Sequence, residues 1–122
     1  MSVRKQLTIN QLTGDLIVSD ACDGRVRVYM PNGHPLFTYG TDGHDRDQLS
    51  CPQGVCSDKS GNILIADRNN HRIHMISEQG NFRSFAVTAE DGLSSPAYVC
   101  VNRDGYLLVA EHTGLVKTFQ YL

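Results

Sequence analysis

A short segment recurs three times in this chain, and this repeat limits the possible folds more than any other feature of the sequence. Each copy is a glycine, one further residue and a largely apolar run that ends at an acidic side chain. The three glycines are Gly14, Gly61 and Gly105, which lie 47 and 44 residues apart. A period of this length predicts that one small supersecondary unit occurs three times.

Apolar segments on both sides of each glycine extend the match. Counted back from the glycines, Leu7–Ile9, Gly54–Cys56 and Tyr98–Cys100 hold the same place. The runs after the glycines are apolar at successive positions, which predicts strands buried on both faces. Farther downstream, residues 25–28 alternate arginine with valine, as expected for a strand with one polar and one apolar face.

Short strands, turn signals between them and the absence of a long helical pattern predict an all-β fold. Units of about 40 to 50 residues with buried inner strands are typical of the blades of a β-propeller. We therefore expect four-stranded antiparallel blades at about residues 7–40, 53–88 and 97–122, the last without its outer strand. Residues 1–6 match no part of the repeat and form an unassigned N-terminal lead.

Three blades cannot close a ring by themselves, because the smallest usual propeller has four. We expect these blades to be part of a ring of six. In a closed propeller the strand missing from the last blade commonly comes from the N-terminal end. Two alternatives stay open, namely an open stack of three blades and a homodimer in which two copies close one ring.

The second repeat carries the most specific motif. Its segments Pro52–Asp58, Gly61–Asp67 and Asn69–Ile73 resemble an NHL repeat, a family named after the Asn-His pair seen here as Asn70-His71. The ending, residues 116–122, resembles the tail of tripartite-motif NHL proteins, and the resemblance covers residues 7–122. The first and third repeats depart from it, with residues 22–25 and 113–114 where the Asn-His pair is expected.

The resemblance implies a non-catalytic interaction module. Tripartite-motif NHL proteins carry a RING, B-boxes and a coiled coil ahead of the propeller. They act as ubiquitin ligases whose propeller chooses the target, and in several members the propeller binds RNA. We expect a protein partner of unknown identity, with an RNA-binding propeller in post-transcriptional repression as the alternative. The residues of this chain contain none of the zinc-binding modules, so they hold no ligase chemistry.

In a blade, the loops after the second strands share one face of the ring with the connectors between blades. We place the candidate partner contacts there: Arg46, Arg68, Asn69, His44 and His112. The repeat signature is expected to be structural, with acids that accept backbone N–H bonds and with links between neighbouring blades. These signature residues are Gly14, Gly61, Gly105, Asp20, Asp67, Asn70, His71 and Arg72.

Charge and motif content argue against several other functions. Acidic residues outnumber basic ones on the expected loop face, and the net charge is −2, so charge does not support RNA or membrane binding. No apolar run approaches the roughly 20 residues of a membrane span. No catalytic motif appears, and His71 and His74 are expected on opposite sides of one strand, so we expect no catalytic residue, cofactor or metal.

The four cysteines lack the close spacing of a zinc site. We expect free thiols and a cytoplasmic location. Cys56 and Cys100 hold equivalent repeat positions, which predicts small core residues.

Overall fold

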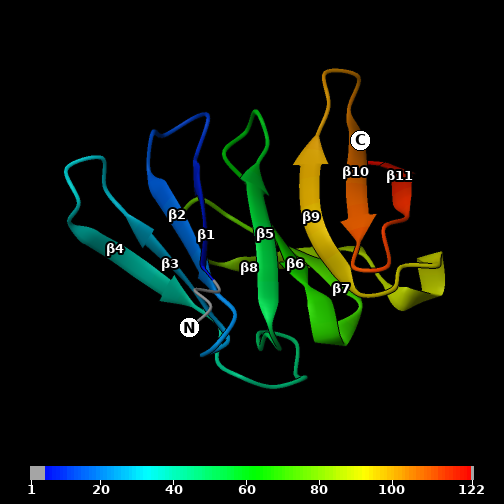
Figure 1. Ribbon diagram of the computed structural model, residues 1–122. Coiled ribbons are helices and arrows are strands. Elements are labelled where there is room, and N and C mark those ends of the chain that lie inside the picture. The colour runs from blue at the N-terminus through cyan, green and yellow to red at the C-terminus, as the bar shows by residue number, and fades with distance from the viewer. Residues whose placement is uncertain (1–4, 122) are drawn as a thin grey trace.

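The computed structural model describes residues 5–121, which form three antiparallel sheets with almost no helix (Figure 1). The predicted all-β fold of about three blades is confirmed. Blade 1 contains β1 (Lys5–Ile9), β2 (Leu16–Asp20), β3 (Arg25–Tyr29) and β4 (Pro35–Tyr39). Blade 2 contains β5 (Pro52–Ser57), β6 (Ile63–Asp67), β7 (Arg72–Ile76) and β8 (Phe82–Val87). Blade 3 contains β9 (Pro96–Val101), β10 (Tyr106–Glu111) and β11 (Val116–Gln120).

Two short 3-10 turns, η1 (Arg68–Asn70) and η2 (Ala89–Asp91), interrupt the loops. No helix within residues 5–121 is long and apolar enough to cross a membrane. Residues 1–4 of the expected lead and Leu122 at the end of the expected third blade lie outside the described residues. The other two lead residues, Lys5 and Gln6, belong to β1, where they pair with Asp20 and Ser19.

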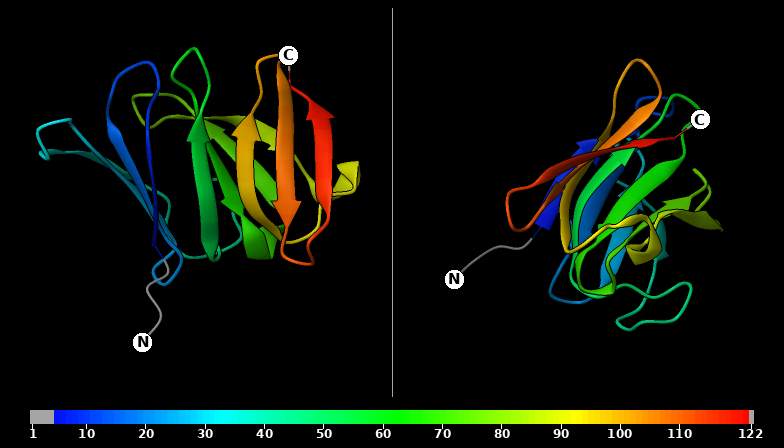
Figure 2. Two further views of the ribbon diagram at one scale, coloured as in Figure 1. Left: turned by 45° about the horizontal axis from the view of Figure 1, so that its top comes forward. Right: turned by 90° about the vertical axis from the view of Figure 1, so that its right-hand side faces the viewer.

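Each blade is a meander in which consecutive strands pair with one another. The first strands lie next to one another, with β5 between β1 and β9 (Figure 1). In Figure 2 the three sheets diverge from this row of strands. The row therefore marks the inner side of the blades, where a propeller has its axis.

The first strand of blade 1 is offset by one residue from the alignment predicted by the sequence. In the structure Cys56 lies opposite Leu64, and the residue opposite the equivalent Ile17 is Thr8. Thr8, and not Ile9, is thus the counterpart of Cys56. The reason is loop length, because six residues join β1 to β2 whereas five join β5 to β6.

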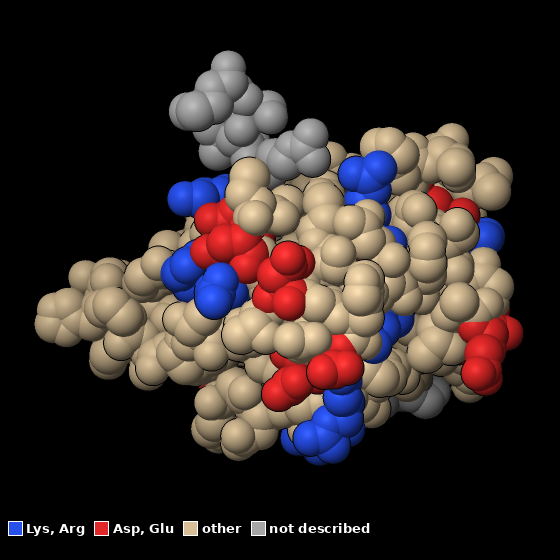
Figure 3. All heavy atoms as spheres, turned by 90° about the horizontal axis from the view of Figure 1, so that it is seen from below, with Lys and Arg blue, Asp and Glu red and all other residues tan. Residues whose placement is uncertain are grey.

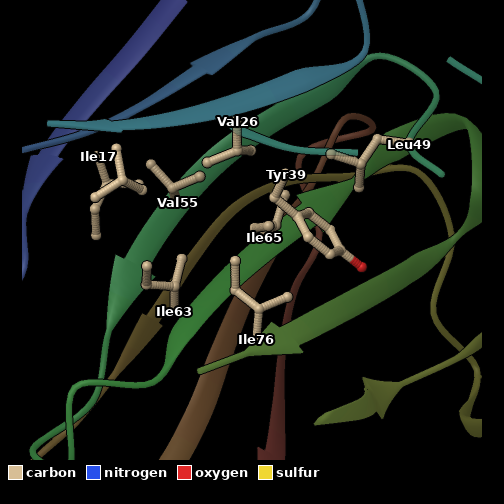
Figure 4. Close-up of a cluster of buried hydrophobic side chains, with 9 residues drawn as sticks. Ile17, Val26, Tyr39, Leu49, Val55, Ile63, Ile65 and Ile76 are labelled. Atoms are coloured by element: carbon tan, nitrogen blue, oxygen red, sulfur yellow. The ribbon is translucent and has the colours of Figure 1, made fainter. Parts of the chain in front are cut away.

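Blade 2 lies between two hydrophobic cores. The core between blades 1 and 2 is drawn in Figure 4, and the second core lies between blades 2 and 3. Every residue of β6 is buried because Ile63 and Ile65 enter the first core while Leu64 and Ala66 enter the second. Each fully buried Ile or Leu stabilises the fold by roughly 1.5 to 3 kcal/mol. The predicted burial on both faces is confirmed for β6. It is wrong for β2 and β10, in which only alternate residues are buried.

In blades 1 and 3, only one face of the sheet is covered by another blade. The expected core position is correct for Cys56, which is largely buried, and burial raises the pKa of its thiol to about 12. The same expectation is wrong for Cys100, which is exposed. Cys100 pairs with Leu108 on the face of blade 3 that points away from blade 2. No part of residues 5–121 covers that face.

Candidate functional site

The loops and connectors at one end of the blades form a common surface, here called the connector face. It comprises loops 21–24, 68–71 and 112–115 and the connectors 40–51 and 88–95. Backbone hydrogen bonds hold these segments together, from the Asn69 N–H to the Ser50 carbonyl (3.1 Å) and from the His112 N–H to the Ser95 carbonyl (2.8 Å). Figure 3 looks at this end and shows acidic and basic side chains interspersed over it.

Two of the five candidate contacts, Arg68 and His112, line one open groove of about 450 Å³. It lies where the first strands of the blades begin, so we call it the axial groove. Its other lining residues are Lys5, Gln6, Pro52, Gln53 and Tyr98.

The axial groove is cationic and carries an aromatic ring. Lys5 and Arg68 supply positive charge, and none of its lining residues is acidic. The Lys5 side chain is 58% exposed and its Nζ lies 3.7 Å from the Asp20 carboxylate, while Tyr98 is 60% exposed. The structure thus brings two cationic side chains and an exposed aromatic ring together. The sequence pattern had indicated neither clustered cations nor exposed aromatic rings on this face. Sequence reasoning missed Lys5, Gln53 and Tyr98. Each lies near the start of the first strand of its blade, and this shared position could have identified them.

The other three candidates lie apart from the groove. The Asn69 amide is exposed and donates to the Ser50 hydroxyl (3.2 Å). The His44 imidazole hydrogen-bonds through Nδ1 to the side-chain oxygen Oδ1 of Asn70. Arg46 stacks its guanidinium 5.0 Å from the Phe82 ring centroid, beside a shallow hollow between β4 and β8. The structure therefore does not bring all five candidates into one site.

Asp67 is the centre of a buried hydrogen-bond network at the end of β6. Its Oδ1 accepts the backbone N–H of Ser50 (2.8 Å). Its Oδ2 accepts from Asn70 Nδ2, Arg72 Nε and His74 Nε2, each at 2.9 Å. Burial alone would raise the pKa of this carboxyl, but the bonds from His74, Ser50 and Asn70 outweigh it and hold the pKa below its usual range. Asp67 is thus an ionised structural anchor.

His74 extends this network into blade 1. Its Nε2–H donates to Asp67, which leaves Nδ1 to accept the hydroxyl hydrogen of Tyr39 (3.1 Å). Burial lowers the pKa of His74, so the imidazole is neutral, and burial raises the pKa of Tyr39, which keeps the hydroxyl protonated. His74 is fully buried and Tyr39 is 5% exposed. The hydrogen bond between these two side chains joins blade 1 to blade 2.

His71 and Arg72 each contact a neighbouring connector. Arg72 donates through Nη2 to the carbonyls of Asp45 (2.6 Å) and Gln48 (2.9 Å), ahead of blade 2. His71 accepts the Ser95 N–H at Nδ1 (2.9 Å), ahead of blade 3. His71 precedes β7 and has a left-handed φ of 53°, so the assumption that it shares a strand with His74 is wrong. Within residues 5–121, no group of three His, Cys, Asp or Glu side chains could hold a metal ion.

The equivalent acids in the other blades also accept backbone N–H bonds. Asp20 accepts from Cys22 (3.0 Å). Glu111 accepts from Ser94 (2.8 Å) and pairs with Lys117 at 2.8 Å, and the Lys117 ammonium lowers the pKa of Glu111.

The repeat glycines all have left-handed backbone conformations. Gly14, Gly61 and Gly105 have φ of 78°, 85° and 82° in the turns that precede the second strands. Residues with a Cβ rarely adopt this conformation, which accounts for glycine at each of these turns.

Comparisons with known proteins agree with this architecture. The sequence model of the NHL repeat matches residues 49–75. Human NHL-repeat-containing protein 4 is 30% identical over 110 residues, which cover 89% of this chain and 85% of that protein. The E3 ubiquitin-protein ligase TRIM71 of Xenopus tropicalis is 38% identical over 56 residues, or 46% of this chain. The chain spans 7% of the length of that ligase.

A solved structure supports the fold alone. Virginiamycin B lyase from Staphylococcus aureus superposes with a TM-score of 0.65 and 18% sequence identity, over 93% of this chain and 40% of the lyase. The matched region is part of a longer chain in that protein. The predicted resemblance to NHL repeats is confirmed by the family match and by the human relative, and the chain belongs to the family of NHL-repeat proteins.

Proposed function

We propose that the connector face, together with the adjoining axial groove, is the protein-binding surface of a non-catalytic interaction module. The observation that carries the proposal is the convergence of Arg68, His112, Lys5 and Tyr98 in one open groove. Arg and Tyr are among the residue types that contribute most at protein interfaces. The groove is lined from the starts of β1, β5 and β9 and from adjoining loops, so a rigid scaffold holds these side chains.

The division of work among the polar residues supports this assignment. Asp67, Asn70 and Arg72 use their polar atoms on one another and on the connectors. In contrast, no hydrogen bond or ion pair within residues 5–121 engages the side chains of Arg68 and His112. Their donors are therefore available to a partner. A cationic groove without acidic lining favours a partner segment that presents carboxylates or backbone carbonyls.

The proposed setting is a ubiquitin ligase of the tripartite-motif NHL type, in which these blades select the target. The similarity to TRIM71, which is named as an E3 ubiquitin-protein ligase, supports this setting. A cytoplasmic location is part of the same proposal, since all four cysteines are free thiols and free thiols persist in a reducing compartment.

Proximity labelling in cells tests the proposal. The protein is fused to a biotin ligase and compared with the double variant Arg68→Ala/His112→Ala. The variant Arg103→Ala serves as the matched control, because Arg103 is exposed in the turn between β9 and β10 and outside the connector face. We expect a reproducible set of labelled proteins that the double variant loses and the control keeps. A wild-type protein that labels no reproducible partner would refute the proposal.

RNA binding is a second candidate because of one specific observation. Tyr98 is 60% exposed in the same groove as Lys5 and Arg68, and single-stranded nucleic acid binds to aromatic rings flanked by cations. Fluorescence anisotropy with a single-stranded RNA would show affinity that falls steeply between about 50 and 200 mM salt. It would also show weaker binding by Tyr98→Ala. The absence of binding at low salt would eliminate this candidate.

A further inference from the structure

Two sheet faces of the molecule have no neighbour within residues 5–121. The first, here called the leading face, is the side of blade 1 away from blade 2. Its apolar residues follow from the strand register, in which Leu7 pairs with Val18 and Ile9 with Leu16. Leu7 is 63% exposed and Ile9 is 56% exposed. Exposed apolar side chains grouped on neighbouring strands are unusual on a protein that has no partner.

The second, here called the trailing face, is the side of blade 3 away from blade 2. It carries Cys100 opposite Leu108 and Val116 opposite Ala110. Val116 is 66% exposed, and Cys100 is exposed as well. Each end of the row of blades therefore presents an uncovered sheet face with exposed apolar side chains. On the leading face these lie on β1 and β2, whereas β3 contributes Arg25 and Arg27.

The repeat itself shows what the leading face is built to meet. In β6, Ile63 and Ile65 pack toward blade 1. Their counterparts in β10, two and four residues after the repeat glycine, pack toward blade 2. The counterparts in β2 are Leu16 and Val18, which lie on the leading face. These repeat positions contact the preceding blade in blades 2 and 3. In blade 1 the same positions have no preceding blade to contact within residues 5–121.

The trailing face follows the complementary rule. Leu64 and Ala66 of β6 pack toward blade 3, and their counterparts Ile17 and Ser19 in β2 are buried on the side toward blade 2. The counterparts in β10 are Leu108 and Ala110, on the trailing face. The trailing face therefore repeats the positions that meet a following blade. The trailing and leading faces thus correspond to the two sides of the blade-to-blade contact, which occurs between blades 1 and 2 and again between blades 2 and 3.

We propose that these faces bind a second copy of this chain, so that two copies close a six-bladed ring. Each copy then places its leading face on the trailing face of the other, and the same contact forms twice. Rings of about four to eight blades are the known range, and among multiples of three only six falls within it. The human relative is matched over 85% of its length by this chain, so a polypeptide of similar size occurs in the same family.

The oligomeric state of the 122-residue chain tests this proposal independently of the axial groove. Size exclusion with light scattering should give twice the 13.5 kDa of one chain at several protein concentrations. A monomer would overturn the proposal, because the blades that cover the open faces would then belong to another part of a longer chain. A polydisperse series of larger species would overturn it too, because it would mean that the contact does not close.

Two variants identify the contact. Leu7→Arg changes the leading face and Val116→Arg the trailing face, and both side chains are mostly exposed in one copy, so each variant should fold. We expect each variant alone to run at the mass of one chain. The control Met30→Arg, at an exposed apolar residue in a turn, should stay dimeric.

Mixing the two variants is the sharper test. A mixed pair restores one contact in which both faces are wild type, the leading face from the Val116→Arg copy and the trailing face from the Leu7→Arg copy. A species of twice the single-chain mass should reappear. If both variants are folded by circular dichroism and no such species forms, the proposed pairing of faces is wrong.

Discussion

We predict that Asp67→Asn lowers the free energy of unfolding by about 3 to 5 kcal/mol, the usual cost of breaking a buried ion pair. The structure explains why a nearly isosteric change has so large an effect. The carboxylate accepts four hydrogen bonds, one at Oδ1 from Ser50 and three at Oδ2 from Asn70, Arg72 and His74. An asparagine side chain has one acceptor oxygen, so its NH2 group must face donors in either orientation.

The loss of charge adds to the loss of acceptors. Arg72 is 13% exposed and pairs with a carboxylate that is fully buried, so the substitution leaves a guanidinium largely out of water without its counter-charge. Domains of this kind are stable by about 5 to 15 kcal/mol in total. Asp67→Asn should therefore remove a large share of the stability of the fold.

Urea unfolding followed by circular dichroism, at one fixed protein concentration, measures the effect. The matched control is Asp20→Asn, the same change at the same repeat position in blade 1. Asp20 lies 3.7 Å from Lys5 and from Arg27, and both cations are substantially exposed, so the control should cost about 1 kcal/mol or less. Equal losses from the two substitutions would refute the claim that burial of the network sets its contribution.

Three further predictions concern the contacts between blades. Because burial lowers the pKa of His74, the unfolded chain binds a proton that the folded chain does not, and stability should fall as pH drops below about 6.5, by up to about 1.4 kcal/mol per pH unit. Urea midpoints measured between about pH 7 and 5 should fall less steeply for His74→Gln, and equal slopes would contradict this origin. Tyr39→Phe leaves His74 Nδ1 without its donor and should cost about 1 to 3 kcal/mol in urea unfolding; an unchanged midpoint would mean that water replaces the hydroxyl. Gly54→Ala places a methyl group 2.9 Å from the Ala97 carbonyl oxygen and the Tyr98 Cα, a clash with backbone that should cost about 1 to 3 kcal/mol. A melting temperature equal to that of the wild type would contradict such a close approach.

The sequence sufficed to predict the blades because burial leaves a periodic signal. Ile63–Ile65 form an unbroken apolar run, and the structure buries them in two cores. The same reasoning failed for Cys100, whose repeat position is buried in blade 2 but uncovered in blade 3. A repeat fixes which way a side chain points, whereas its burial depends on whether another blade follows.

The candidate site was less accessible to prediction because it is assembled across the blades. Arg68 and His112 were placed on a shared face from loop positions, but Lys5 and Tyr98 join them only because the first strands lie next to one another. The one-residue difference before Gly14 was also hidden, since apolar residues occur at both Leu7 and Ile9 and fit either register. The composition of the groove and the register of β1 both depend on contacts between segments that are far apart or separated by a loop, and the repeat pattern does not encode these contacts.

The burial of blade 2 on both faces has a consequence for how such proteins are recognised. A strand that lies between two cores accepts few substitutions, because each side chain must fit one core or the other. Blades 1 and 3 each contribute to only one core within residues 5–121, so fewer of their side chains are constrained in this way. The family signature is accordingly found at residues 49–75, within and just ahead of the central blade. Searches that rely on such signatures will detect the middle of a row of blades more readily than its ends, and will underestimate how many blades a chain contains.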